Sequence, residues 1–162
     1  MNAWGAIAGG FVGTVVLTTA LRAAGELGLT RMDLPFLLGT ALTADRTRAK
    51  ALGFVLHFVV GQFFAFVYLG IFAAIGHSGW ALGALFGLLH GLFAGSALVS
   101  VLLPVIHPRM GTPVSSAGDR PLLEPPGFMM LNYGQGTPLV TLVAHVAYGA
   151  IVGGFTALSA TR

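Results

Sequence analysis

The stretch that decides the fold is WALGALFGLLHGLFAGSALVSVLL, residues Trp80–Leu103, which contains no Asp, Glu, Lys or Arg. At a rise of about 1.5 Å per residue, a helix of this length crosses a hydrocarbon layer about 30 Å thick. The run shows no strand-like alternation, and a single segment in a bilayer satisfies its own backbone hydrogen bonds only as a helix. The segment is therefore predicted to be a transmembrane helix.

Three other apolar runs have a comparable length, at residues 4–22, 52–75 and 138–159, with no charged residue strictly inside them. The composition agrees, because 56% of the residues are hydrophobic and 8% are charged, whereas a soluble domain carries about 25% charged residues. The sequence predicts an all-α polytopic membrane protein, in which residues 1–162 form one domain of four transmembrane helices. The connection over 104–137 is rich in proline and is predicted to be extended.

The basic residues are distributed as topology signals. Seven of the eight Lys and Arg residues lie at or in the two long connections, and Arg162 alone lies on the opposite side. The positive-inside rule then predicts cytoplasmic connections and external termini. This distribution accounts for the net charge of +3 without a nucleic-acid partner. No basic region precedes the first span, which is expected to be a retained anchor.

Short motifs recur in the two halves of the chain. Each half has a Trp at the start of a span, an Arg-Met-x-x-Pro segment and a His-x-x-x-Gly segment. These lie at Trp4, 31–35 and 57–61 in the first half, and at Trp80, 109–113 and 145–149 in the second. The pattern predicts two tandem helical hairpins of the same orientation, related by an axis along the membrane normal. His57 and His145 would then lie at one depth.

Glycine recurs every fourth residue along the third span, at Gly79, Gly83, Gly87, Gly91 and Gly95. Small residues at this spacing let transmembrane helices approach closely, since lipid gives no hydrophobic drive for their association. We therefore expect this stripe to be a helix-packing surface.

The helical histidines are the candidate functional residues, because an ionisable side chain within a span is costly. Facing each other across the bundle, His57 and His145 would suit haem or copper, which both accept imidazole ligands. His107 and Met110, expected at the same membrane edge, could add metal ligands. The alternative is that the imidazoles only bridge helices, at about 1 kcal/mol each.

Three functions remain open from these residues. The first is a binding or organising protein that holds haem or a transition metal at the histidine pair. The second is a small transport or channel module, in which glycine faces line a path and His90 handles protons. The third is an accessory structural subunit. We do not expect an enzyme, since no orienting acid accompanies Ser96 and His145 and cysteine is absent. The expected partners are the lipid bilayer and either further copies of the chain or a larger membrane complex.

Several segments resemble the small bacterial inner-membrane proteins of the YagU-like type. The similarity lies in His57 to Tyr68, in Trp80 to Pro104 continuing to Gly111-Thr112-Pro113, and in Ala144-His145-Val146. The resemblance implies a location in the bacterial inner membrane. It transfers no catalytic residue, because that family has no settled biochemical activity, and residues 113–135 lie outside it.

Overall fold

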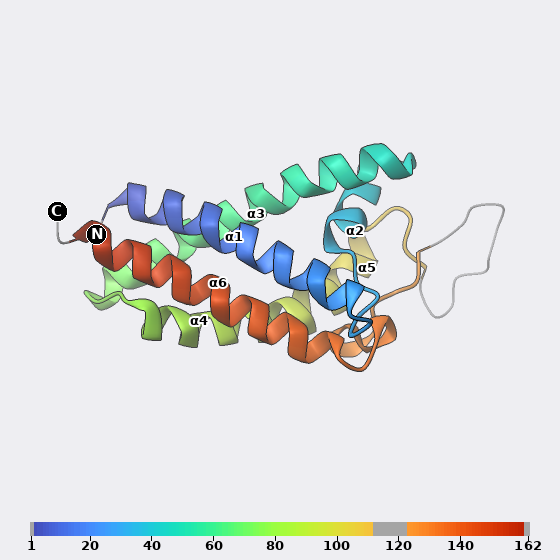
Figure 1. Ribbon diagram of the computed structural model, residues 1–162. Coiled ribbons are helices and arrows are strands. Elements are labelled where there is room, and N and C mark those ends of the chain that lie inside the picture. The colour runs from blue at the N-terminus through green and yellow to red at the C-terminus, as the bar shows by residue number, and fades with distance from the viewer. Residues whose placement is uncertain (1, 112–122, 161–162) are drawn as a thin grey trace.

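The computed structural model describes residues 2–111 and 123–160, and it contains four long antiparallel helical segments. These are α1 (Ala3–Glu26), α3 (Arg46–Ile75), a continuous segment made of α4 (Trp80–Phe93), π-helical η1 (Ala94–Leu102) and α5 (Leu103–Ile106), and α6 (Thr137–Ala160). Both termini lie at one end of the bundle, and the short helix α2 (Leu34–Thr40) lies at the other (Figure 1). The described residues contain no strand, which confirms the predicted all-α class.

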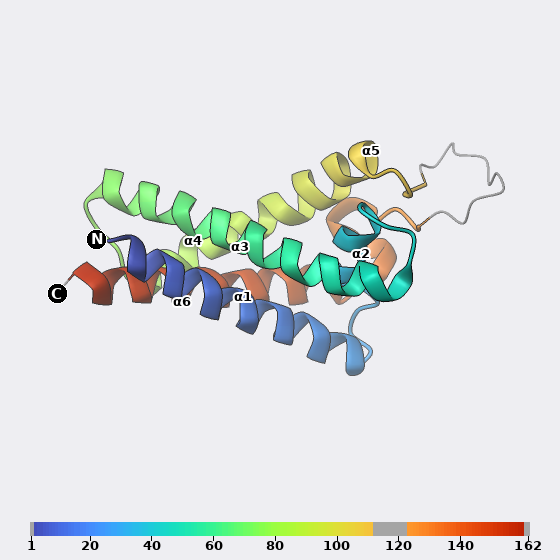
Figure 2. The same cartoon turned by 90° about the horizontal axis from the view of Figure 1, so that it is seen from above.

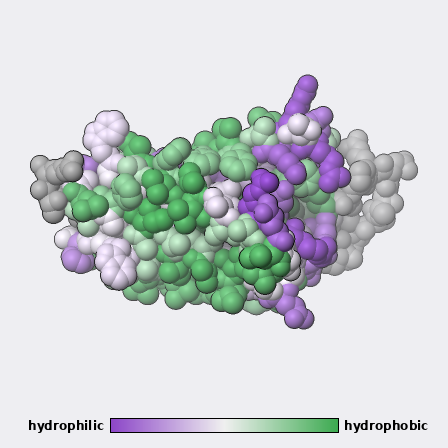
Figure 3. All heavy atoms as spheres, viewed as in Figure 1, coloured by the Kyte–Doolittle hydropathy of each residue, from purple (hydrophilic) through white to green (hydrophobic). Residues whose placement is uncertain are grey.

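On the face shown in Figure 3, apolar residues cover the middle of the bundle, and hydrophilic residues gather mainly at the end that carries α2. Large apolar side chains of the long helices, such as Phe63, Leu89 and Val101, are exposed. Each of the four segments is long and apolar enough to cross a bilayer. The fold is that of a multi-pass integral membrane protein.

Local sequence signals set the helix ends. The Asp45 side chain accepts a hydrogen bond from the backbone N–H of Arg48 (2.7 Å), so α3 begins earlier than residue 52. Asn2 caps α1 in the same way through Gly5. At the other end of α3, Gly76 adopts a left-handed conformation (φ 75°), which favours glycine and allows the tight turn into α4.

Glycine brings α6 into close contact with α4. A Cβ atom at Gly83 would overlap the carbonyl oxygen of Gly149, and one at Gly87 would overlap that of His145. The rest of the glycine stripe has other surroundings. Gly91 faces the His145 side chain, and Gly95 faces Met129. Gly79 meets α6 only through its carbonyl oxygen, which a Cβ at Gly153 would overlap. The stripe therefore packs on the α6 backbone over only part of its length.

In each hairpin, the His-x-x-x-Gly segment faces the preceding long helix. In the first hairpin, Thr14 of α1 lies against Gly61 of α3, and Thr18 lies against His57. In the second, Gly83 and Gly87 of α4 take the corresponding places against Gly149 and His145 of α6. The two segments thus face corresponding positions of the preceding long helix, but Gly61 meets the Thr14 side chain whereas Gly149 meets backbone atoms of α4. The tryptophans do not lie at corresponding positions. Trp80 directly follows Gly79, which faces Gly153 of α6, whereas Trp4 lies well before Gly10, which faces Ala65 of α3.

The interfaces between the hairpins differ from each other. Glycines of α1 lie directly on α6, with a Cβ at Gly9 only 3.0 Å from the Val152 Cα atom. On the opposite side, α3 and α4 meet through rings, including Phe64 on His90 at 4.0 Å and Phe72 on Phe86 at 6.0 Å between centroids. The bundle is therefore closely packed on the α1–α6 side and held apart on the α3–α4 side.

The connections are more structured than the sequence predicts. Helix α2 packs against the start of α3, where Gly39 and Gly53 bring the two backbones together. The third connection, expected to be extended over 104–137, contains α5 and a 3-10 segment, η2 (Phe128–Tyr133). The buried Met130 and Tyr133 of η2 belong to the hydrophobic core, so η2 packs against the bundle. Residues 112–122 of this connection lie outside the described residues.

Candidate functional site

A cavity of about 420 Å³ lies between α3 and the α4–η1–α5 segment. These two elements diverge toward the end of the bundle that carries α2 (Figure 2). The walls are almost entirely apolar, and α1 and α6 form the back. Phe63 of α3 and Ile106 of α5 line the mouth and are 60% and 64% exposed. The cavity therefore opens on the apolar outer surface of the bundle.

A π-helix forms one wall of the cavity. Pro104 has no backbone N–H, and its ring would clash with the carbonyl of Ser100 in a regular α-helix. The wider turns of η1 directly precede it, and the Ser100 hydroxyl donates a hydrogen bond to the Gly95 carbonyl oxygen within them. Such π-helical stretches are rare and often occur at functional sites. Here η1 carries Leu98, Val99 and Leu102 to the cavity surface.

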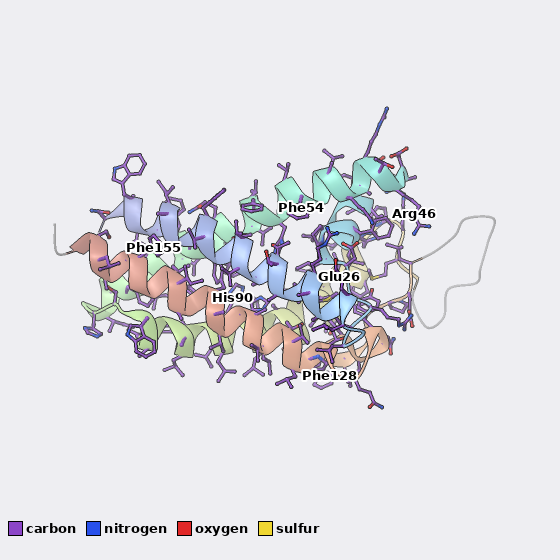
Figure 4. The ribbon with its side chains drawn as sticks, viewed as in Figure 1. Glu26, Arg46, Phe54, His90, Phe128 and Phe155 are labelled. Carbon is purple, nitrogen blue, oxygen red and sulfur yellow. The ribbon has the colours of Figure 1, made fainter. Side chains whose placement is uncertain are left out.

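His90 lies between the helices of the bundle, whereas Glu26 and Arg46 lie at the end that holds the two long connections (Figure 4). The His90 ring contacts the His145 ring edge-on, with 4.8 Å between centroids. Its Nδ1 atom is 3.3 Å from the Tyr68 hydroxyl. A partly buried imidazole thus connects α3, α4 and α6.

His57 and His145 also line this cavity, and the Nδ1 atom of each ring forms a hydrogen bond. The Nδ1 atom of His145 is 2.8 Å from the carbonyl oxygen of Thr141, one turn earlier in α6. The Nδ1 atom of His57 is 3.1 Å from the Thr18 hydroxyl of α1. The structure thus places all three helical histidines at one cavity, and His145 contacts His90, although the sequence pattern paired His145 only with His57.

The other two residues proposed as metal ligands do not line this cavity. His107 lies at the end of α5, where its Nε2 atom is 3.1 Å from the Leu37 carbonyl and its Nδ1 atom accepts the Arg109 backbone N–H (3.1 Å). Burial and the nearby Arg109 lower the pKa of His107, and the Leu37 hydrogen bond opposes this shift only in part. Met110 is buried in the hydrophobic core. Among the described residues, no group of three or more His, Asp or Glu side chains is arranged to hold a metal ion.

Three polar residues at the site were missed by the sequence analysis. Tyr68 bonds His90, Thr18 bonds His57, and Thr141 lines the cavity beside His145. Thr141 and His145 are one helical turn apart, so a 3.6-residue period on α6 places them on one face. The contact between His90 and His145 also follows from register, because the Gly83–Gly149 and Gly87–His145 pairs align α4 with α6.

Comparisons with protein-family models, curated proteins and solved structures give no match to this chain.

Proposed function

We propose that this membrane protein binds a lipid-soluble small molecule in the histidine-lined cavity. The observation that carries the proposal is an apolar cavity of about 420 Å³ with three imidazoles at its surface. Ligand sites of small molecules typically have about 300–1,000 Å³ of space, apolar walls and a few convergent polar groups. The mouth lies between Phe63 and Ile106 on the lipid-facing surface, so the ligand enters sideways from the bilayer.

The proposal is for binding without chemistry. Ser96, the nucleophile considered in the sequence analysis, does not line the cavity, and its hydroxyl donates to the Leu92 carbonyl oxygen (2.6 Å). The described carboxylates are Glu26, Asp33, Asp45 and Glu124, and none of them lines the cavity. The imidazoles therefore have no acidic partner there that would support acid–base catalysis. Transport along a glycine-lined path and an accessory role in a larger complex stay predictions.

Filling the cavity tests the proposal. Leu98→Trp adds a large ring at the η1 wall, and we expect it to weaken binding of an uncharged, environment-sensitive aromatic dye at least about tenfold, since the dye would compete with the indole for the same volume. The measurement is dye fluorescence titrated against purified protein in nanodiscs. Val101→Trp is the matched control, because Val101 belongs to η1 but does not line the cavity. Equal affinity for both variants and the wild type would contradict the proposal.

A second candidate function is a haem or copper site at His57 and His145. The observation that favours it is that each Nδ1 atom is paired with an oxygen, as is usual for histidines that ligate metal through Nε2. We expect His57→Ala or His145→Ala to abolish bound metal or haem absorbance, whereas His77→Ala, on the exposed α3–α4 turn, should leave both unchanged. Metal analysis and absorption spectra after expression with copper and haem precursor supplied would check this. A colourless, metal-free wild type would eliminate the candidate.

We also propose a location in the bacterial inner membrane with external termini and cytoplasmic connections. The support is the charge distribution together with the resemblance to YagU-like proteins. The α3–α4 turn lies at the same end as the termini, so we expect an impermeant thiol reagent to label Ser78→Cys in intact spheroplasts but to miss Thr43→Cys. Both positions suit this test because the wild-type chain has no cysteine. The reverse labelling pattern would invert the topology.

A further inference from the structure

The hydrogen bonds around the cavity fix which ring nitrogens of two histidines carry hydrogen. A carbonyl oxygen can only accept, so the Nδ1 atom of His145 must donate to Thr141. The Thr18 hydroxyl directs its one hydrogen to the Thr14 carbonyl oxygen at 2.7 Å. Its oxygen is therefore left to accept, and the Nδ1 atom of His57 must donate to it.

The Nε2 atoms of His57 and His145 consequently present lone pairs. An imidazole in an apolar cavity without a carboxylate partner is neutral, because burying an unpaired charge is costly, and a neutral ring carries only one hydrogen. Neither Nε2 atom has a hydrogen-bond partner within the described residues. Both residues line the cavity, and neither Nε2 atom is among the fully enclosed polar atoms without a partner. The cavity therefore offers two acceptors that lack donors.

Thr141 supplies an independent sign of a missing polar partner. The residue is 2% exposed and lines the same cavity. Its hydroxyl oxygen is the one enclosed side-chain polar atom without a hydrogen-bond partner in the part of the chain that the structure describes. Buried polar atoms are rarely left unpaired, so an unpaired hydroxyl next to a cavity indicates a polar group that is supplied from outside the chain.

We infer that the ligand of this cavity is a lipid-soluble phenol or hydroquinone, whose hydroxyl group donates to an imidazole Nε2 atom. This inference rests on the proposed binding function and specifies its ligand. A hydroxyl donates to a lone pair and can accept from Thr141 at the same time, which matches both unsatisfied groups. A carbonyl or an ether oxygen could also accept from Thr141, but it has no hydrogen to donate and would leave the imidazole lone pairs unpaired. The site therefore selects the hydroxyl form of a ligand against its quinone or ether.

The rings at the cavity favour a planar ligand. Phe64 and Tyr148 line it together with the three histidines. These rings already contact one another; for example, the ring centroids of His90 and Tyr148 are 6.0 Å apart. Aromatic groups gain from such offset and edge-on contacts with further rings. An aromatic alcohol consequently fits these walls better than an aliphatic one of the same polarity.

Displacement of the cavity dye tests this inference. The probes are an alkyl hydroquinone, its dimethyl ether and the corresponding quinone, titrated anaerobically into protein in nanodiscs. We expect the hydroquinone to displace the dye at a concentration at least about tenfold lower than either analogue, since only the hydroquinone satisfies the acceptors. Equal displacement by the three compounds would overturn the inference while leaving the binding proposal intact. The inference would also be overturned if Leu98→Trp weakens dye binding but none of the three compounds displaces the dye from the wild type.

Histidine variants separate hydrogen bonding from shape. Phenylalanine keeps a ring but removes Nε2, so His57→Phe or His145→Phe should bring the affinities for hydroquinone and dimethyl ether within about threefold of each other. His77→Phe is the control, because His77 is exposed on the turn between α3 and α4, and the preference should persist in it. Full preference in both cavity variants would contradict the assignment.

If these variants fail to fold, the comparison of the three probes on the wild type decides. A dye that binds equally to the wild type and Leu98→Trp would instead reject the underlying binding proposal.

Discussion

Gly83→Ala is expected to destabilise the bundle by about 3 kcal/mol or more, because overpacking a tight interface costs this much when the backbone cannot yield. The added methyl carbon would overlap the carbonyl oxygen of Gly149, which is backbone of α6 and has no rotamer to change. Gly149→Ala should behave alike, since its Cβ would overlap the Gly83 carbonyl oxygen. The measurement is thermal or denaturant unfolding of the purified protein in one detergent.

Gly70 is the matched control for this substitution. It also lies inside a long helix, but a Cβ atom there would meet nothing within 4 Å. Alanine is a better helix former than glycine by about 1 kcal/mol, so Gly70→Ala should keep or raise the melting temperature. Gly91→Ala should fall between, because its nearest neighbour is the His145 Cβ atom at 3.0 Å. Equal stability of Gly83→Ala and Gly70→Ala would show that α4 and α6 are not in backbone contact.

The helices themselves could be predicted from the sequence because the signal is local. Twenty or so uncharged apolar residues define a span without reference to any neighbour. The glycine spacing also indicated a packing face on α4, and Gly83 and Gly87 lie on α6 as such a face requires. The spacing could not indicate which element each glycine packs against. Gly95 continues the same stripe, yet it meets Met129 of η2, since that segment folds back onto the bundle.

The cavity was not predictable because it depends on which interface remains open. The motifs recur in both hairpins, so a symmetric bundle would have similar α1–α6 and α3–α4 interfaces. The difference lies in side-chain size, with Gly9 and Gly13 on the α1–α6 side and Phe64, Tyr68 and Phe86 on the α3–α4 side. Large rings separate those backbones and leave the volume into which His57 and His90 project. Only the assembled register shows this combination.

Helix α2 completes the cavity, and its position depends on one glycine of α3. Leu34 and Leu38 contribute to the cavity wall, next to Leu17 and Met32. A Cβ atom at Gly53 would overlap the Pro35 carbonyl oxygen and lie 2.9 Å from the backbone nitrogen of Gly39. Both atoms belong to the backbone of α2, so no side-chain rearrangement can make room.

Gly53→Ala is therefore expected to release α2 from α3 while the four long helices stay assembled, because α4 and α6 pack without it. Hydrogen–deuterium exchange should rise at residues 34–40 by at least about tenfold, since a helix of this length has little stability without its packing partner. Dye affinity should fall with it, because one wall of the cavity is lost. Gly39→Ala should give the same result from the other side, as its Cβ would overlap the Ala49 carbonyl oxygen. Gly70→Ala makes the same change on the same helix and should alter neither quantity. Protection of residues 34–40 at the wild-type level in Gly53→Ala would show that α2 is not held by this contact.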